Sequence, residues 1–292
     1  MNNKVSVFVV GAPKAGTTTL FQILLQSKDV VLPLAKEPNY FSSDFHMRWE
    51  NFNKTDAKNI KRFPKKYKPG LFHSAKTDNI EDYKKMFFPT GKDQTLIDFS
   101  TTYLSSITAP KMIYDYNPKA KIIIIIRDPL SRAWSHYNMD KAIGYHQKPF
   151  TECLEEEEDA IKHDRDYPYS YIRDSDYQKS VKRYQDNFEE SQILLVNFSS
   201  FIKNQDFEIR NICKFIEIKY FSYSLNTDLN SSRKFRFEKL RWLSIIIKLF
   251  VNKLPIPKKI KSIVKKIIFK RVKLPKPDDQ YIKGFFKSCN IT

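Results

Sequence analysis

The chain has 292 residues, 51 Lys and Arg against 33 Asp and Glu, and a formal net charge of +18. With 41% hydrophobic and 14% aromatic residues it can bury a core, which excludes a disordered chain. Three cysteines without a C-x-x-C pair exclude a disulfide framework and a cysteine-based zinc site, and they favour a reducing compartment. No apolar run reaches the roughly 20 residues that a membrane helix needs. We therefore expect a cytoplasmic protein, soluble or peripheral on the membrane, and the basic excess indicates a polyanionic partner.

The predicted elements alternate between strands and helices. Val5–Val10 is an apolar run without helical period, typical of a strand buried on both faces of a sheet. The five consecutive isoleucines within 121–126 predict the clearest central strand. The other expected elements are helix 17–26, strand 30–32, helix 80–88, strand 95–99, helices 130–142, 151–163 and 174–188, strand 192–197 and helix 207–216. This alternation predicts an α/β fold, a parallel sheet flanked by helices, in a single domain over 1–292.

The basic excess is concentrated in one segment, 233–276. It holds 16 Lys and Arg and a single acid, so the rest of the chain has a net charge of only +3. Two amphipathic helices are expected there, at 240–254 and 260–272, separated by prolines, and a short helix is expected over 278–292. The segment could attach to an anionic membrane surface, dock a charged glycan, or pack as a solvated helical cap. Because the excess lies in this appended region, no nucleic-acid partner is expected.

Two of the six glycines, Gly11 and Gly16, bracket a loop between the first strand and the first helix. Glycines let the backbone bring its N–H groups against a phosphate, and the helix that begins near Thr17 points its positive end at the same anion. Lys14 adds a point charge. The spacing matches a Walker A loop, but Thr17 stands where that motif has Lys, which disfavours an ordinary ATPase or GTPase. A P-loop kinase or NTPase of a small substrate remains an alternative, as does a non-catalytic polyanion- or membrane-binding protein on the same fold.

A second signature follows the isoleucine strand. Arg127 leaves the carboxyl end of that strand, where α/β proteins bind their ligands. Ser135 comes eight residues later, about two turns up the following helix. A guanidinium fork and a hydroxyl in this arrangement can hold one phosphate together.

These stretches, Phe8–Leu20 and Ile126–Tyr137, resemble the 5′-phosphosulfate loop and the 3′-phosphate element of sulfotransferases that use 3′-phosphoadenylyl sulfate (PAPS). A third stretch, Lys36–Phe41, reads KEPNYF and resembles the K-E-x-x-F-F element of the heparan-sulfate-type carbohydrate branch, and we expect a bacterial member. The resemblance implies a P-loop NTPase-like fold. It also implies sulfuryl transfer from PAPS to a hydroxyl or amine of a glycan or glycolipid acceptor, with adenosine 3′,5′-bisphosphate (PAP) as product and no metal.

The resemblance also assigns roles to single residues. Lys14 is expected to stabilise the leaving phosphate and Glu37 to act as general base, with His73 and His136 as substitute bases. The expected cofactor-binding residues are Lys14, Ala15, Gly16, Thr17, Thr18, Thr19, Arg127, Ser135 and Arg233. The stretch from Asp98 departs from the family element E-K-S/T-P-x-Y, because Phe99 replaces the Lys and Thr101 the Pro. The acidic run 155–159 is most simply a solvated helix face, or less simply a contact for a cationic acceptor. The sequence names neither the acceptor nor an oligomeric state.

Overall fold

The computed structural model describes residues 4–44, 58–59, 68–77, 79–89, 91, 93–224, 233–235 and 269–271, with positions 280, 282, 284 and 286 of a terminal helix. The chain divides into two compact units. The larger comprises 1–137, 148–225 and 278–292, and the smaller 138–147 and 226–277. The expectation of a single domain stays a prediction. In the part of the chain that is described, no helix has both the length and the apolar character needed to cross a membrane.

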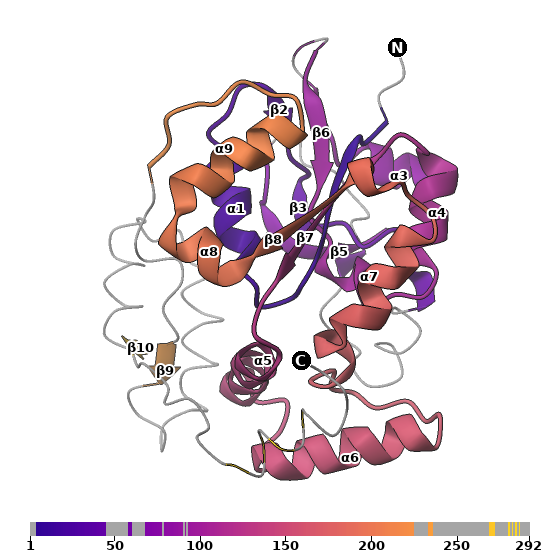
Figure 1. Ribbon diagram of the computed structural model, residues 1–292, viewed down its shortest axis with the longest axis vertical. Coiled ribbons are helices and arrows are strands. Elements are labelled where there is room, and N and C mark those ends of the chain that lie inside the picture. The colour runs from indigo at the N-terminus through magenta and orange to yellow at the C-terminus, as the bar shows by residue number, and fades with distance from the viewer. Residues whose placement is uncertain are drawn as a thin grey trace. The chain divides into compact units, whose positions relative to one another are not determined.

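The larger unit is built on a five-stranded parallel sheet with the strand order β2-β6-β1-β7-β8 (Figure 1). Its strands are β1 (Val7–Gly11), β2 (Val30–Val31), β6 (Thr95–Asp98), β7 (Lys121–Ile126) and β8 (Ile193–Asn197). Ile122, Ile123, Ile124 and Ile125 of β7 are fully buried between β1 and β8. The predicted α/β fold and its central isoleucine strand are confirmed.

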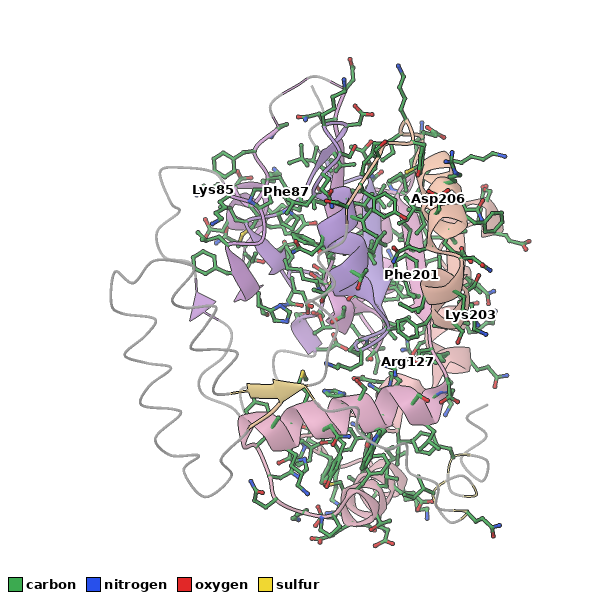
Figure 2. All side chains as sticks on the ribbon, turned by 90° about the vertical axis from the view of Figure 1, so that its left-hand side faces the viewer. Lys85, Phe87, Arg127, Phe201, Lys203 and Asp206 are labelled. Atoms are coloured by element: carbon green, nitrogen blue, oxygen red, sulfur yellow. The ribbon has the colours of Figure 1, made fainter. Side chains whose placement is uncertain are left out.

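Helices cover both faces of this sheet. On one side lie α1 (Thr17–Leu24), α8 (Phe198–Lys203) and α9 (Gln205–Phe215), and on the other α4 (Ala109–Tyr116) and α7 (Tyr177–Gln185) (Figure 1). Phe201 of α8 points inward and is fully buried, whereas Lys203 and Asp206 point outward (Figure 2). The amphipathic faces of these helices are what the sheet buries.

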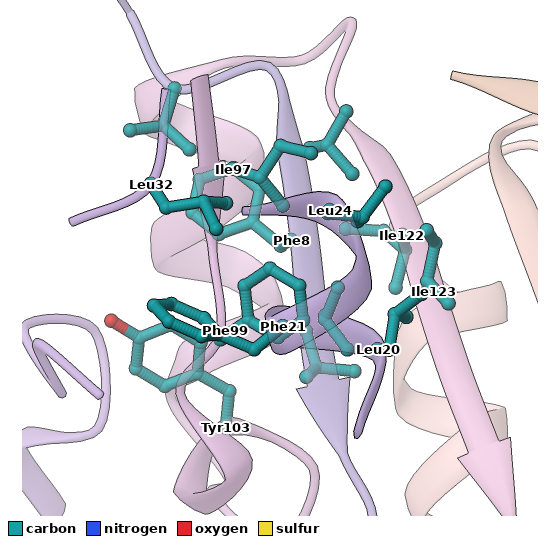
Figure 3. Close-up of a cluster of buried hydrophobic side chains, with 14 of the residues drawn as sticks. Phe8, Leu20, Phe21, Leu24, Leu32, Ile97, Phe99, Tyr103, Ile122 and Ile123 are labelled. Atoms are coloured by element: carbon teal, nitrogen blue, oxygen red, sulfur yellow. The ribbon is translucent and has the colours of Figure 1, made fainter. Parts of the chain in front are cut away.

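One hydrophobic cluster fills the space between the sheet and its helices (Figure 3). Phe21 of α1 packs edge-on against Phe99, with 5.2 Å between the ring centroids. Phe8 of β1 packs in the same way against Phe41, at 5.6 Å. Complete burial of one such ring contributes roughly 1.5–3 kcal/mol, so these contacts hold β1 and α1, the two elements that flank the glycine loop.

A second cluster joins α5 (Pro129–Ile143) and α6 (Phe150–Lys162) to the C-terminal tail. Its buried members are Ala133, Tyr137, Phe150, Cys153, Leu154, Tyr171, Ile172, Ile282 and Phe286. The described positions of the tail are helical, as predicted, and Ile282 and Phe286 lie four residues apart on one face of that helix.

A three-stranded sheet with the order β3-β5-β4 was missed by the sequence prediction. Its strands are β3 (Ala35–Glu37), β4 (Lys58–Asn59) and β5 (Phe72–Lys76). They are two to five residues long and rich in polar residues, so neither alternation nor an apolar run marks them. The Lys-Glu pair, which reads in isolation as a solvated turn, therefore belongs to a largely buried strand.

Two predicted helices need correction. The helix expected at 260–272 is wrong for Phe269–Arg271, because these residues form β10, antiparallel to β9 (Arg233–Phe235). The helical segment expected over 233–276 is thereby wrong at both β9 and β10. Its other residues, including all of 240–254, lie outside the described residues. The helix expected at 80–88 ends as α3 (Ile80–Lys84), because the N–H groups of Met86 and Phe87 bond to the carbonyls three residues back, of Tyr83 and Lys84, instead of four.

The reading of the acidic run as a solvated face is wrong for Glu157. Its carboxyl is fully buried and accepts the backbone N–H groups of Tyr171 at 2.7 Å, Ile172 at 2.9 Å and Arg173 at 3.0 Å. Burial raises the pKa of Glu157 to about 7, although these hydrogen bonds act in the opposite direction. Glu157 therefore anchors the loop that leads into the 3₁₀ turn η2 (Arg173–Ser175).

Candidate functional site

The glycine-rich loop lies between β1 and α1, at the carboxyl edge of the parallel sheet. Gly16 precedes α1 with φ +89°, a conformation that favours glycine, and a Cβ there would lie 2.9 Å from the ring of Phe198. Among the described residues no side chain forms a capping hydrogen bond at the start of α1, so the helix presents its backbone N–H groups and its positive end to the loop. The remaining expected loop residues differ in exposure: Ala15, Thr17 and Thr19 are buried, and Lys14 and Thr18 are half-buried.

The structure brings Lys14 and Arg127 together. Arg127, labelled in Figure 2, follows the last residue of β7, and its Nη1 donates a hydrogen bond to the carbonyl oxygen of Lys14 at 2.8 Å. Its guanidinium lies over the ring of Phe198, 4.8 Å from the centroid. After β1 the chain continues toward β2 at one edge of the sheet, and after β7 it continues toward β8 at the other edge. Parallel α/β sheets bind ligands at the carboxyl ends of two neighbouring strands that diverge in this way. The two phosphate elements predicted from sequence therefore lie side by side.

Ser135 lies half-buried on α5, and no hydrogen bond of its hydroxyl is found among the described residues. Arg132, three residues earlier, is fully buried, and its hydrogen bonds hold a loop against α5. It donates to Ser175 Oγ at 2.7 Å and to the carbonyls of Ser170 at 3.0 Å and Tyr171 at 2.6 Å. The loop that Glu157 anchors is thus also fastened to α5, and this fixes the helix on which Ser135 is carried.

His136 is not placed to act as a base. Its Nδ1 lies 3.2 Å from Nη1 of Arg132, a distance at which the neutral ring accepts a hydrogen bond. Burial and the positive charges of Arg132 and Lys14 hold the pKa of His136 well below its usual range. The ring is therefore neutral at pH 7, with Nδ1 engaged by the arginine.

Glu37, the predicted base, ends β3 and has three partners around its carboxyl, which is only 12% exposed. Lys36 Nζ lies 2.7 Å from Oε1, and the Thr101 hydroxyl donates to Oε2 at 3.0 Å. His73, an exposed residue of β5, places Nε2 3.9 Å from Oε1. Lys36 Nζ also lies 3.5 Å from Thr17 Oγ1, so it links Glu37 to the first residue of α1.

These partners set the protonation of Glu37. Burial raises its pKa, but the charges of Lys36 and His73 and the hydrogen bonds from Lys36 and Thr101 outweigh burial. The pKa of Glu37 therefore lies below its ordinary value, and the carboxylate is ionised at neutral pH. An ionised carboxylate in this position can accept a proton.

Asp98 fixes the loop that holds Thr101. One of its oxygens accepts the Ser100 N–H at 2.9 Å and hydroxyl at 2.6 Å, and the other accepts the hydroxyls of Tyr83 at 2.9 Å and Tyr103 at 3.0 Å. Ser100 in turn accepts the N–H of Asn39 at 2.9 Å, two residues after Glu37. Burial raises the pKa of Asp98 to about 6, against the effect of these hydrogen bonds.

Sequence reasoning predicted site roles for Lys14, Glu37, Arg127 and Ser135, and these roles stay predictions. It gave no site role to Lys36, Asp98, Thr101 or Phe198. An acid at a strand end followed by hydroxyl residues was the available signal for Asp98 and Thr101. Phe99, which stands where the family element has Lys, is fully buried in the core.

The other expected contact, Arg233, belongs to β9 in the smaller unit, and its side chain lies outside the described residues. Its role stays a prediction. Within the described ranges, no three side chains of His, Cys, Asp or Glu gather as a metal site does.

Comparisons with known proteins identify the family of this chain. The model of the sulfotransferase family matches residues 6–222. The bifunctional heparan sulfate N-deacetylase/N-sulfotransferase 4 of Mus musculus is 31% identical over 144 residues, which cover 48% of this chain and 13% of that protein. The heparan sulfate glucosamine 3-O-sulfotransferase 5 of Homo sapiens is 24% identical over 230 residues, 78% of this chain and 57% of that protein.

The chain thus spans less than two thirds of the length of each of these curated relatives. A solved sulfotransferase from Alicyclobacillus acidocaldarius is 26% identical with a TM-score of 0.60, covering 77% of this chain and 87% of its own. The family match includes the glycine loop, Glu37, Arg127 and Ser135. The chain belongs to the sulfotransferase family.

Proposed function

We propose that this sulfotransferase moves a sulfuryl group from PAPS to a hydroxyl or amine of a carbohydrate or glycolipid acceptor and releases PAP. The contact of Lys36 with both Thr17 and Glu37 carries the proposal, because it sets a proton-accepting carboxylate beside a phosphate-binding loop. The curated relatives are named for their action on heparan sulfate, which supports a glycan acceptor.

The residues present fit a nucleotide with phosphates at both ends of its ribose. The uncapped N-terminus of α1 and Lys14 supply positive charge and N–H donors for the 5′-phosphate. Arg127, oriented by the Lys14 carbonyl and the Phe198 ring, and Ser135 supply donors for the 3′-phosphate. None of these contacts needs a metal ion.

Positioning and charge dominate the proposed mechanism, because a sulfuryl group bound to phosphate is already a strong electrophile. Glu37, ionised at neutral pH, takes the proton of the acceptor as its oxygen or nitrogen attacks sulfur. Lys14 balances the negative charge that grows on the departing 5′-phosphate. His73, which is largely exposed, places its Nε2 3.9 Å from Oε1 of Glu37.

Calorimetry with PAP tests the donor assignment. We expect saturable binding of PAP, with ATP at least tenfold weaker because it lacks the 3′-phosphate. Glu37→Gln should keep PAP affinity and lose on the order of 100-fold in transfer from radiolabelled PAPS to an N-deacetylated heparan-type glycan, the usual contribution of a general base. Equal preference for ATP, or Mg²⁺-dependent ATP turnover, would support the P-loop kinase alternative instead.

We also propose that residues 233–276 attach the protein to the cytoplasmic face of an anionic membrane. Their 16 basic residues against one acid support this, since each Lys or Arg near such a surface contributes about 1 kcal/mol at low salt. Co-sedimentation with liposomes containing phosphatidylserine should fall sharply on deletion of 235–274 and in a variant with the lysines of 253–266 changed to Gln. Equal pelleting of the wild type and the deletion variant would exclude attachment to lipid by this segment, and binding of a sulfated glycan would then be the alternative.

A further inference from the structure

Lys36 is the most deeply buried cation near the proposed base. The residue is 4% exposed, and its ammonium lies 2.7 Å from Glu37 Oε1 and 3.5 Å from Thr17 Oγ1. Burying an ammonium is unfavourable unless it is paired and hydrogen-bonded, and Glu37 supplies one charged partner. This cation lies between the proposed base and the start of α1, rather than within the core, and that placement needs an explanation.

The ammonium group has a donor to spare. Lys carries three N–H groups, and the acceptors found for Lys36 among the described residues are Glu37 and Thr17. The contact to Thr17 is long for a hydrogen bond, so it can be given up for a better acceptor. The residue that follows β6 cannot take the place of Lys36 as a cation. It is Phe99, which packs against Phe21 in the core.

The position of the ammonium follows the line of the proposed reaction. In an in-line transfer the reacting sulfur lies between the leaving oxygen and the attacking atom. The leaving phosphate is assigned to the start of α1, where Thr17 lies, and the attacking atom to Glu37. A cation that touches both residues therefore stands beside the group in transit.

We propose that Lys36 is a further catalytic residue, whose ammonium group binds the oxygens of the sulfuryl group during transfer; this rests on the proposed function. In that step the bond from sulfur to the 5′-phosphate oxygen breaks, and its electron pair stays on the phosphate. The acceptor oxygen or nitrogen forms the new bond to sulfur and gives its proton to Glu37. Lys36 remains protonated throughout and neutralises charge that the planar sulfuryl group exposes.

Binding of PAPS and PAP by calorimetry tests this, because the two nucleotides differ only in the sulfuryl group. The comparison is made between Glu37→Gln and the double variant Lys36→Gln/Glu37→Gln, so that no unpaired carboxylate confuses the result. We expect PAPS affinity to fall about tenfold in the double variant, the scale of a lost charge-assisted hydrogen bond, with PAP affinity changed less than twofold. Equal weakening of both nucleotides, or unchanged PAPS affinity, would overturn the proposal.

Lys36→Arg provides an independent arm that keeps the charge and the ion pair with Glu37. A guanidinium is wider and differently shaped than an ammonium, so we expect kcat to fall at least about tenfold while PAP affinity is retained. An unchanged kcat would contradict a contact with the sulfuryl group. Lys111→Met, at an exposed lysine of α4, is the matched control and should leave both nucleotides unaffected. Failure of the wild type to bind PAP would instead refute the proposed function itself.

Discussion

The Thr101 hydroxyl offers a clean test of how Glu37 is tuned. Thr101 belongs to the 3₁₀ turn η1 (Thr101–Tyr103), is 7% exposed and donates to Glu37 Oε2 at 3.0 Å. Thr101→Val keeps the branched shape of the side chain and removes this donor. Because the hydrogen bond favours the ionised carboxylate, its loss raises the pKa of Glu37.

The size of the shift follows from the geometry. A hydrogen bond to a charged group contributes roughly 1.5–3 kcal/mol, and one pKa unit corresponds to about 1.4 kcal/mol. The Glu37 side chain is only 12% exposed, so solvent screens this interaction little. We therefore expect the pKa of Glu37 to rise by about one unit, toward its ordinary value.

The acid limb of kcat/KM against pH reports this pKa in the free enzyme. The limb should move about one unit to higher pH in Thr101→Val, with the rate at neutral pH little changed, because Glu37 stays ionised there. Thr102→Val is the matched control: its hydroxyl donates to Asn39 Oδ1 at 2.8 Å and does not touch Glu37. An unmoved limb in Thr101→Val, or an equal movement in Thr102→Val, would refute the reasoning.

Three further outcomes are expected. Gly16→Ala should weaken PAP binding about tenfold or more by calorimetry, because Ala is strained at φ +89° and its Cβ meets the Phe198 ring at 2.9 Å; unchanged affinity would mean that the loop adapts freely. Arg127→Lys should weaken PAP about 10- to 100-fold, the scale of charge-assisted hydrogen bonds, but leave adenosine 5′-phosphate unaffected; equal loss for both would place Arg127 away from the 3′-phosphate. The pKa of Glu157 is about 7 in the folded state and about 4.5 in the unfolded state, so binding of its proton stabilises the folded state. The free energy of unfolding should therefore fall by roughly 3 kcal/mol as the pH rises from about 4.5 to 7. Urea unfolding across this range should show the decline, and Glu157→Gln should make it shallower without abolishing it, because Asp98 also has a raised pKa of about 6. An equally steep decline in the variant would assign it to other groups.

Most of the central layer could be predicted from local pattern. The isoleucine run of β7 and the apolar run before Gly11 are buried on both faces, and strands of that kind are recognised in the sequence as continuous apolar runs. The glycine loop and Arg127 could be singled out because they follow such strands. The short polar strands β3 and β5 carry no such signal, since they owe their conformation to pairing with each other rather than to their own residues.

The sequence by itself determined the α/β class, the glycine loop at a strand end and the concentration of positive charge in 233–276. Only the tertiary structure decided which neighbours each functional side chain meets. Glu37 and Thr101 are 64 positions apart, and Lys14 and Arg127 are 113 apart. Hydrophobic periodicity reports which face of an element is buried, but the partners of a buried polar group are fixed by how distant strands are brought to one edge of a sheet.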